Sequence, residues 1–180
     1  MKVSNKLKII IVISIIFLIS IFVLSKRYLE DYTSDFIDHN IYSNTLGEER
    51  KIFIRLPKGY DKKKSYPLII KSDGNFNLSR WDESMADLSH KNMIEDSIIV
   101  AIPNLFWIDS RNRDLVPPYA RKDVKIEARP KNDNSPLIFG KADLFLNFIE
   151  LEVIPYIENN YSINNNRVLS GFSAGGSFVL

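Results

Sequence analysis

A serine between glycines near the end of the chain has the type and spacing of a catalytic nucleophile. Gly171-Phe172-Ser173-Ala174-Gly175 fits the pattern G-x-S-x-G, and it follows residues 167–170, which are predicted to form a short strand. Residues 171–176 would form a sharp turn, and a helix is expected from Ser177 onward. Glycines let the backbone approach closely, and the helix start directs N–H groups at a developing oxyanion. This pattern favours acyl transfer to Ser173.

Two other interpretations of the same residues stay open. The segment could be a glycine-rich turn between a strand and a helix with no catalytic role. It could also bind phosphate, but no lysine follows the glycines as a P-loop requires.

The rest of the body is expected to form the α/β sheet that positions this turn. Alternating polar and apolar residues predict a half-buried strand at residues 50–56, and apolar runs predict strands covered on both faces at 68–71 and 97–102. Helical patterns cover residues 79–93 and 142–159, and Pro155 should kink or end the second helix. Residues 103–138 are rich in Pro, Asn, Asp and Arg, which indicates a long functional loop or a disordered insert.

The N-terminus predicts a separate segment, so we expect two regions, 1–30 and 31–180. Ile9 to Leu24 holds fourteen apolar residues in sixteen and has lysines on both sides. As a helix it would span roughly 24 Å, and flanking lysines can extend towards the membrane surface. We favour an uncleaved anchor with the body outside the cytoplasm; a cleaved signal peptide, giving a secreted protein, or a buried core helix are the alternatives.

Charge and composition exclude several functions. The chain carries 24 Lys and Arg and 22 Asp and Glu, of which 19 and 21 fall in residues 31–180, so the body has no excess of basic charge for nucleic acid. Cysteine is absent, which excludes disulfides, a thiolate nucleophile and a cysteine-based zinc site. We expect no metal and no organic cofactor.

Three segments in order resemble the esterase D-like branch of the α/β-hydrolases, which includes enterochelin and bacillibactin esterases. "YPLIIKSDGN" resembles that family's strand followed by Asp-Gly, "SRNRDLVP" its Arg-x-Arg-Asp-Leu-Thr-Pro loop, and "GKADLFLNFIELEVIPYIENNYSINNNRVLSGFSAGGSFVL" the region leading into its nucleophile. The resemblance runs from about Tyr42 to the last residue. It implies an α/β-hydrolase fold and a small-molecule carboxylic ester, such as a siderophore-type ester, as substrate. An acyltransferase would be a close variant.

The resemblance also implies roles for single residues. Ser173 would be the nucleophile, and the backbone N–H groups of Ala174 and Asn75 would bind the oxyanion. Asp73 and Gly74 would belong to a loop at the substrate, and a plain turn is the alternative. A further loop lining the site would carry Arg111, Arg113 and Asp114, which could instead form a solvated charge cluster. Val116 departs from the family's threonine, so no polar role is expected there.

The triad of this fold runs in the order Ser, then Asp or Glu, then His. The two histidines, His39 and His90, both precede Ser173. A serine without its base is a weak nucleophile. We therefore expect the 180 residues to be the N-terminal part of a hydrolase, incomplete in its sheet and inactive alone. A non-catalytic remnant or an anchored binding module is the alternative.

Overall fold

The apolar N-terminal segment forms one long helix, α1 (Asn5–Tyr32). Its residues Asn5–Ser25 have a mean hydropathy of 3.1, so the helix is long and apolar enough to cross a membrane, although signal sequences near an N-terminus meet the same criterion. The structure is a computed structural model that describes residues 5–32, 34–104, 110–118 and 140–180. The chain divides into two units, Met1–Ser34 and Asp35–Leu180.

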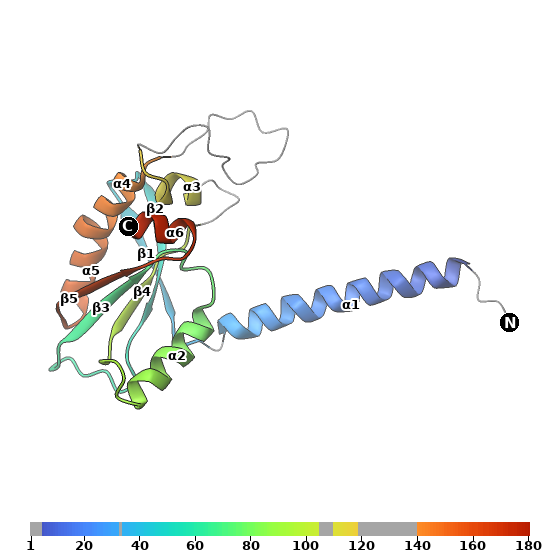
Figure 1. Cartoon of the computed structure of the whole chain (residues 1–180), viewed down its shortest axis with the longest axis horizontal. Helices are drawn as coiled ribbons and strands as arrows, with labels where there is room; N and C mark the ends of the chain where they lie inside the picture. The colour runs from blue at the N-terminus through green and yellow to red at the C-terminus, as the bar shows by residue number, and fades with distance from the viewer. Residues whose placement is uncertain (1–4, 33, 105–109, 119–139) are drawn as a thin grey trace. The chain divides into compact units, whose positions relative to one another are not determined.

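A five-stranded mixed sheet organises the second unit (Figure 1). Its strands are β1 (Ile37–Ser43), β2 (Glu48–Arg55), β3 (Tyr66–Lys71), β4 (Ile98–Ala101) and β5 (Ile163–Ser170), in the order β1-β2-β4-β3-β5. β1 and β2 run antiparallel to their neighbours, whereas β3 is parallel to both β4 and β5. The carboxyl ends of β3, β4 and β5 therefore meet at one edge, where open α/β sheets bind their ligands.

Alternation along the strands separates the two faces of the sheet. One face packs apolar side chains, with Ile52, Leu68 and Val100 fully buried, against Phe145 and Phe148. These two phenylalanines belong to α4 (Ala142–Phe148), which leads through a π-helical turn (Ile149–Val153) into α5 (Ile154–Asn160).

The opposite face carries polar side chains towards α2 (Leu78–His90). Arg55 of β2 forms an ion pair with Asp82 at 2.5 Å, and the Lys71 ammonium of β3 lies 5.8 Å from the ring centre of Trp81. Two short helices complete the unit, α3 (Ser110–Leu115) and α6 (Ala174–Val179).

The α/β class predicted from the sequence is confirmed, but three details differ. β1 was not predicted, because only its last residue, Ser43, is buried and its apolar pattern is weak. The helix predicted at 142–159 does not end at Pro155: the π-helical turn precedes this proline, and the helix continues to Asn160. α6 begins at Ala174 rather than Ser177, so the turn before it is tighter than expected. Most of the predicted loop 103–138 lies outside the described residues.

Candidate active site

The loops that follow β3 and β5 lie side by side because the two strands are parallel neighbours. Lys71 pairs with Ser170 at their carboxyl ends, and the Ser72 N–H donates a hydrogen bond of 2.9 Å to the Ser170 carbonyl. The segment after β3 and the turn after β5 are thus held together. Segments almost a hundred residues apart in sequence converge here.

Ser173 lies in this turn with a strained backbone. Its φ of 56° and ψ of −118° place a residue with a Cβ in a sparsely populated region, and α6 starts at the next residue. The turn is closed by hydrogen bonds from Gly175 N–H to the Phe172 carbonyl, 3.0 Å, and from Ser177 N–H to the Ser173 carbonyl, 3.1 Å. The Ser173 side chain is exposed at the end of the sheet.

The glycines on either side allow this close approach. A Cβ at Gly175 would lie 2.4 Å from the Ser72 hydroxyl oxygen, so α6 packs directly on the loop after β3. Gly171 has still less space, since its Cβ would meet backbone atoms of Gly175. A side chain at position 171 would therefore collide with the backbone, whereas at position 175 the close contact is with the side-chain hydroxyl of Ser72.

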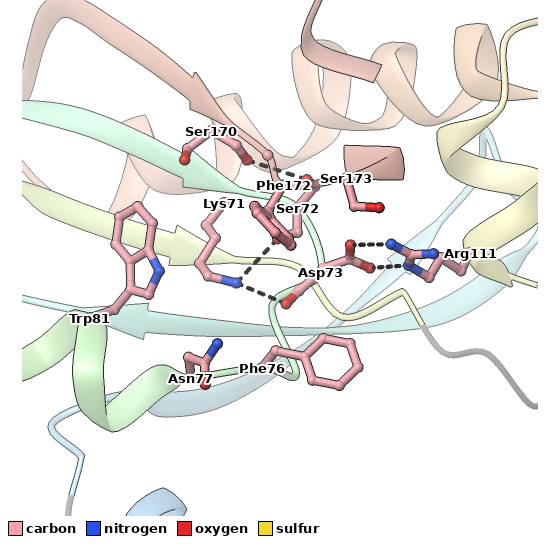
Figure 2. A pocket seen from close by; sticks show the side chains of 11 residues that line it. Lys71, Ser72, Asp73, Phe76, Asn77, Trp81, Arg111, Ser170, Phe172 and Ser173 are labelled. Carbon is pink, nitrogen blue, oxygen red and sulfur yellow. Dashed lines mark hydrogen bonds and ion pairs between the residues drawn. The ribbon is translucent and has the colours of Figure 1, made fainter. Parts of the chain in front are cut away.

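A cavity of about 690 Å³ opens beside Ser173. Its walls come from the end of β3, the start of α2, α3 and the turn after β5 (Figure 2). The lining residues are Lys71, Ser72, Asp73, Phe76, Asn77, Trp81, Arg111, Ser170, Gly171, Phe172 and Ser173. The volume falls within the range of small-molecule sites.

Asp73 and Arg111 form a bidentate ion pair in the wall of this cavity. Arg111 Nε lies 2.9 Å from Asp73 Oδ1, and Arg111 Nη2 lies 3.1 Å from Asp73 Oδ2. Both residues are buried, and Asp73 has a left-handed φ of 51°. The Asp73 carboxylate also lies close to Gly175, where a Cβ would be 3.5 Å from Oδ2. Asp73, the first residue of the predicted Asp-Gly turn, is thus held in the cavity wall by Arg111.

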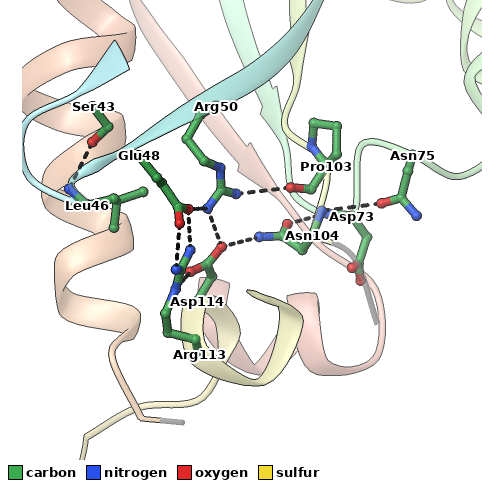
Figure 3. A network of polar contacts seen from close by, with 10 residues as sticks. All are labelled: Ser43, Leu46, Glu48, Arg50, Asp73, Asn75, Pro103, Asn104, Arg113 and Asp114. Atoms are coloured by element: carbon green, nitrogen blue, oxygen red, sulfur yellow. Dashed lines mark hydrogen bonds and ion pairs between the residues drawn. The ribbon is translucent and has the colours of Figure 1, made fainter. Parts of the chain in front are cut away.

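Arg113 and Asp114, which were expected to line the site with Arg111, lie elsewhere. The three residues belong to the helix α3 rather than to a loop, and α3 directs only Arg111 into the cavity. Nor do Arg113 and Asp114 form a solvated cluster, because the Asp114 side chain is fully buried and accepts hydrogen bonds from Arg50, 2.7 Å, and Arg113, 2.7 Å. Glu48 completes this network by accepting two hydrogen bonds from the Arg113 guanidinium (Figure 3).

The network also supports the loop after β3. The buried Asn104 donates to Asp114 Oδ2 at 3.0 Å and accepts from the Asp73 N–H at 3.0 Å (Figure 3). Burial lowers the pKa of Arg113, but its hydrogen bonds to Glu48 and Asp114 outweigh this effect and raise the pKa above its usual value. Hydrogen bonds through Asn104 thus connect Arg113 and Asp114 to the loop after β3.

The expected oxyanion donors lie at the same edge. The N–H groups of Ala174 and Asn75 have no hydrogen-bond partner within the described part of the chain. The Asn75 side chain accepts from the Asn104 N–H at 3.3 Å, and its amide nitrogen is buried without a partner among the described residues. Gly74 packs on the backbone of Ile102, so neither Gly74 nor Asn75 lines the cavity.

No histidine lies at the cavity. His39 is on β1, where its Nδ1 lies 3.3 Å from the Tyr156 hydroxyl, and His90 is exposed at the end of α2. Among the described residues there is also no group of three or more side chains that could hold a metal ion.

Sequence reasoning missed several cavity residues. Phe76, Trp81 and Phe172 form aromatic walls, and Lys71 adds a buried cation. Of these four residues, only Lys71 could have been predicted from the sequence, because it is a charged residue at the end of an otherwise apolar strand.

Comparison with known proteins identifies the family of this chain. Residues 43–180 match the family model described as "Putative esterase". The chain is 31% identical to the ferri-bacillibactin esterase BesA of Bacillus subtilis over 136 residues, which cover 72% of this chain and 46% of BesA.

Solved structures show the same fold. The BES protein from Bacillus cereus has a TM-score of 0.65 and 31% identity, over 81% of this chain and 56% of that one. An IroE-like serine hydrolase from Shewanella oneidensis has a TM-score of 0.66 and 30% identity, over 79% of this chain and 44% of that one. The chain thus spans about half the length of the relatives it matches.

Proposed function

Since this chain belongs to the family described as "Putative esterase", we propose that it is an ester hydrolase that uses Ser173 as its nucleophile. The observation that carries the proposal is the strained Ser173, exposed between β5 and α6 beside a cavity of about 690 Å³. Strain of this kind persists where the surrounding structure over-determines it, which is common at active sites. The glycines at positions 171 and 175 supply that constraint.

The proposed reaction is acyl transfer through a covalent intermediate. Ser173 Oγ attacks the ester carbonyl, its proton passes to a base, and the negative oxygen of the tetrahedral intermediate accepts hydrogen bonds from backbone N–H groups. The Ala174 N–H follows the nucleophile, and the Asn75 N–H follows Asp73-Gly74. As the intermediate collapses, the bond from the carbonyl carbon to the alcohol oxygen breaks and the protonated base gives its proton to that oxygen, which leaves an acyl-Ser173 ester and a free alcohol. Water then attacks the acyl ester and releases the acid and Ser173.

No histidine lies among the described residues that line the cavity, since His39 and His90 are both elsewhere. We propose that turnover needs a base beyond these residues and that the 180-residue chain alone is at most slowly reactive. Loss of a triad member typically lowers the rate by about 10⁴- to 10⁶-fold.

The relatives and the cavity together suggest the substrate class. One relative is a ferri-bacillibactin esterase, and the cavity has the aromatic walls Phe76, Trp81 and Phe172. We propose a siderophore-type or other aromatic ester. We also propose that α1 anchors the protein in a membrane, with the sheet unit outside the cytoplasm.

The test uses an irreversible probe, because it does not require turnover. The purified chain is incubated with a fluorescent fluorophosphonate, and the labelled residue is located by peptide mass spectrometry. We expect slow labelling at Ser173, its loss in Ser173→Ala, and its retention in Ser177→Ala, a matched change of an exposed serine in α6. Labelling that survives Ser173→Ala, or no labelling of a folded chain, would refute the proposed nucleophile. Rapid hydrolysis of a p-nitrophenyl ester by the chain alone would refute the need for a further base.

A further inference from the structure

Lys71 is a buried cation in the wall of the candidate active site. It is 7% exposed at the end of β3, and its side chain lies on the face of the sheet covered by α2. Its ammonium donates to the carbonyls of Ser72, 3.2 Å, and Asp73, 2.8 Å (Figure 2). These two bonds hold the ammonium beside the Trp81 ring.

Lys71 differs from the other buried cations of the sheet unit. Arg50, Arg55 and Arg111 each form an ion pair with a buried carboxylate, at 2.7, 2.5 and 2.9 Å. Lys71 forms no ion pair and leaves its third N–H without a partner within the described part of the chain. Buried charges are normally paired, so an unpaired ammonium at a cavity indicates that its counter-charge arrives with a ligand.

We propose that Lys71 is a specificity-determining residue that binds an anionic oxygen of the substrate, with the adjoining apolar part of the substrate against Trp81. The inference rests on the proposed function, because it names the substrate class of the same cavity. The anionic oxygen would accept a hydrogen bond from the third N–H of Lys71 and neutralise the charge of the ammonium. A substrate with a neutral group at this position would leave the ammonium without an ion-pair partner.

The charge of Lys71 should also make this recognition pH-dependent. Burial lowers the pKa of Lys71 to about 8, against the opposing effect of the Asp73 carboxylate. The other charged group in the cavity wall is Arg111, which holds Asp73 from α3; the lining residues from α2 and from the turn after β5 are not ionisable. Anion binding is therefore expected below pH 8 and should weaken as the pH rises through 8 towards 10.

The test compares benzoate with its neutral analogue benzamide, using calorimetric titration of the full chain in detergent at pH 6.5. We expect benzoate to bind about tenfold more tightly, as for a charge-assisted hydrogen bond. Lys71→Met should reduce this preference to less than about twofold. Lys64→Met, a change of an exposed lysine before β3, should retain it. Equal binding of the two probes, no binding of benzoate, or a preference that survives Lys71→Met would overturn the proposal.

Two further measurements keep the result interpretable. If Lys71→Met fails to fold, the preference of the wild-type chain for benzoate over benzamide is measured from pH 6.5 to 10. Benzoate stays ionised throughout this range, so only a change in the protein can alter the preference. A preference that stays constant over this range would overturn the inference. Fluorophosphonate labelling of Ser173 in the same preparation tests the proposed function separately. Labelling without a benzoate preference refutes only the role of Lys71, and a Lys71-dependent preference without labelling refutes only the nucleophile.

Discussion

The Cα of Gly171 faces the main-chain carbonyl of Gly175, and a Cβ at position 171 would lie 2.0 Å from that oxygen. The obstacle is backbone, so it cannot be relieved by a side-chain rotation. The contact joins the end of β5 to the first turn of α6, and Ser173 lies between them. The position of Ser173, the proposed nucleophile, therefore depends on the absence of a side chain at residue 171.

Gly171→Ala should destabilise the sheet unit and displace the turn. We expect the free energy of unfolding to fall by about 1–3 kcal/mol, as for overpacking. Gly176→Ala is the matched control, because its Cβ would be 3.6 Å from the nearest atom and alanine favours a helix. Urea unfolding measures both variants, and equal effects would contradict the steric role of Gly171.

Ser173→Gly should stabilise the protein while removing the proposed nucleophile. Ser173 has a φ of 56°, a conformation that glycine adopts without steric cost. We expect a gain of about 1 kcal/mol in the free energy of unfolding. Ser173→Ala keeps the Cβ and should give no comparable gain. If the two variants are equally stable in urea, the backbone at position 173 is not strained.

Lys71→Met should stabilise the protein at neutral pH. Because burial lowers the pKa of Lys71 from 10.5 to about 8, the unfolded chain holds one more proton than the folded chain between these values, and wild-type stability rises with pH in that window. The variant should be more stable at pH 7 by about 1–3 kcal/mol, and the difference should shrink towards pH 10.5. Urea unfolding at a series of pH values measures it. A difference that is constant with pH would contradict this account.

Glu48→Gln should weaken the protein at neutral pH but not in acid. The hydrogen bond from Arg113 lowers the pKa of Glu48 below its ordinary value of 4.5, although partial burial opposes this. The carboxylate therefore stabilises the fold above pH 4.5, and this contribution is lost as the pH falls through the lowered pKa. We expect a loss of about 1 kcal/mol at pH 7. Glu49→Gln, at an exposed neighbouring site, should show no such pH-dependent loss in thermal unfolding.

The positions of the main elements follow from local patterns in the sequence. Apolar runs at residues 68–71 and 97–102 predicted strands covered on both faces, and they overlap with β3 and β4. The glycines around Ser173 indicated a turn with a close backbone contact, since no other residue fits such a contact. β1 was missed because an edge strand with little burial carries a weak pattern.

The sequence alone determined the fold class, the sharp turn at Ser173 and the apolar character of the N-terminal helix, because each depends on residues close together in the chain. Tertiary structure decided which polar residues share the cavity. Arg111 and Arg113 are two positions apart on one short helix, yet one reaches Asp73 and the other Glu48, because successive side chains of a helix point in different directions. Lys71 lines the cavity because β5 pairs with β3 and α2 covers the face of the sheet on which the Lys71 side chain lies. Burial and charge pairing of this kind depend on contacts between distant segments of the chain.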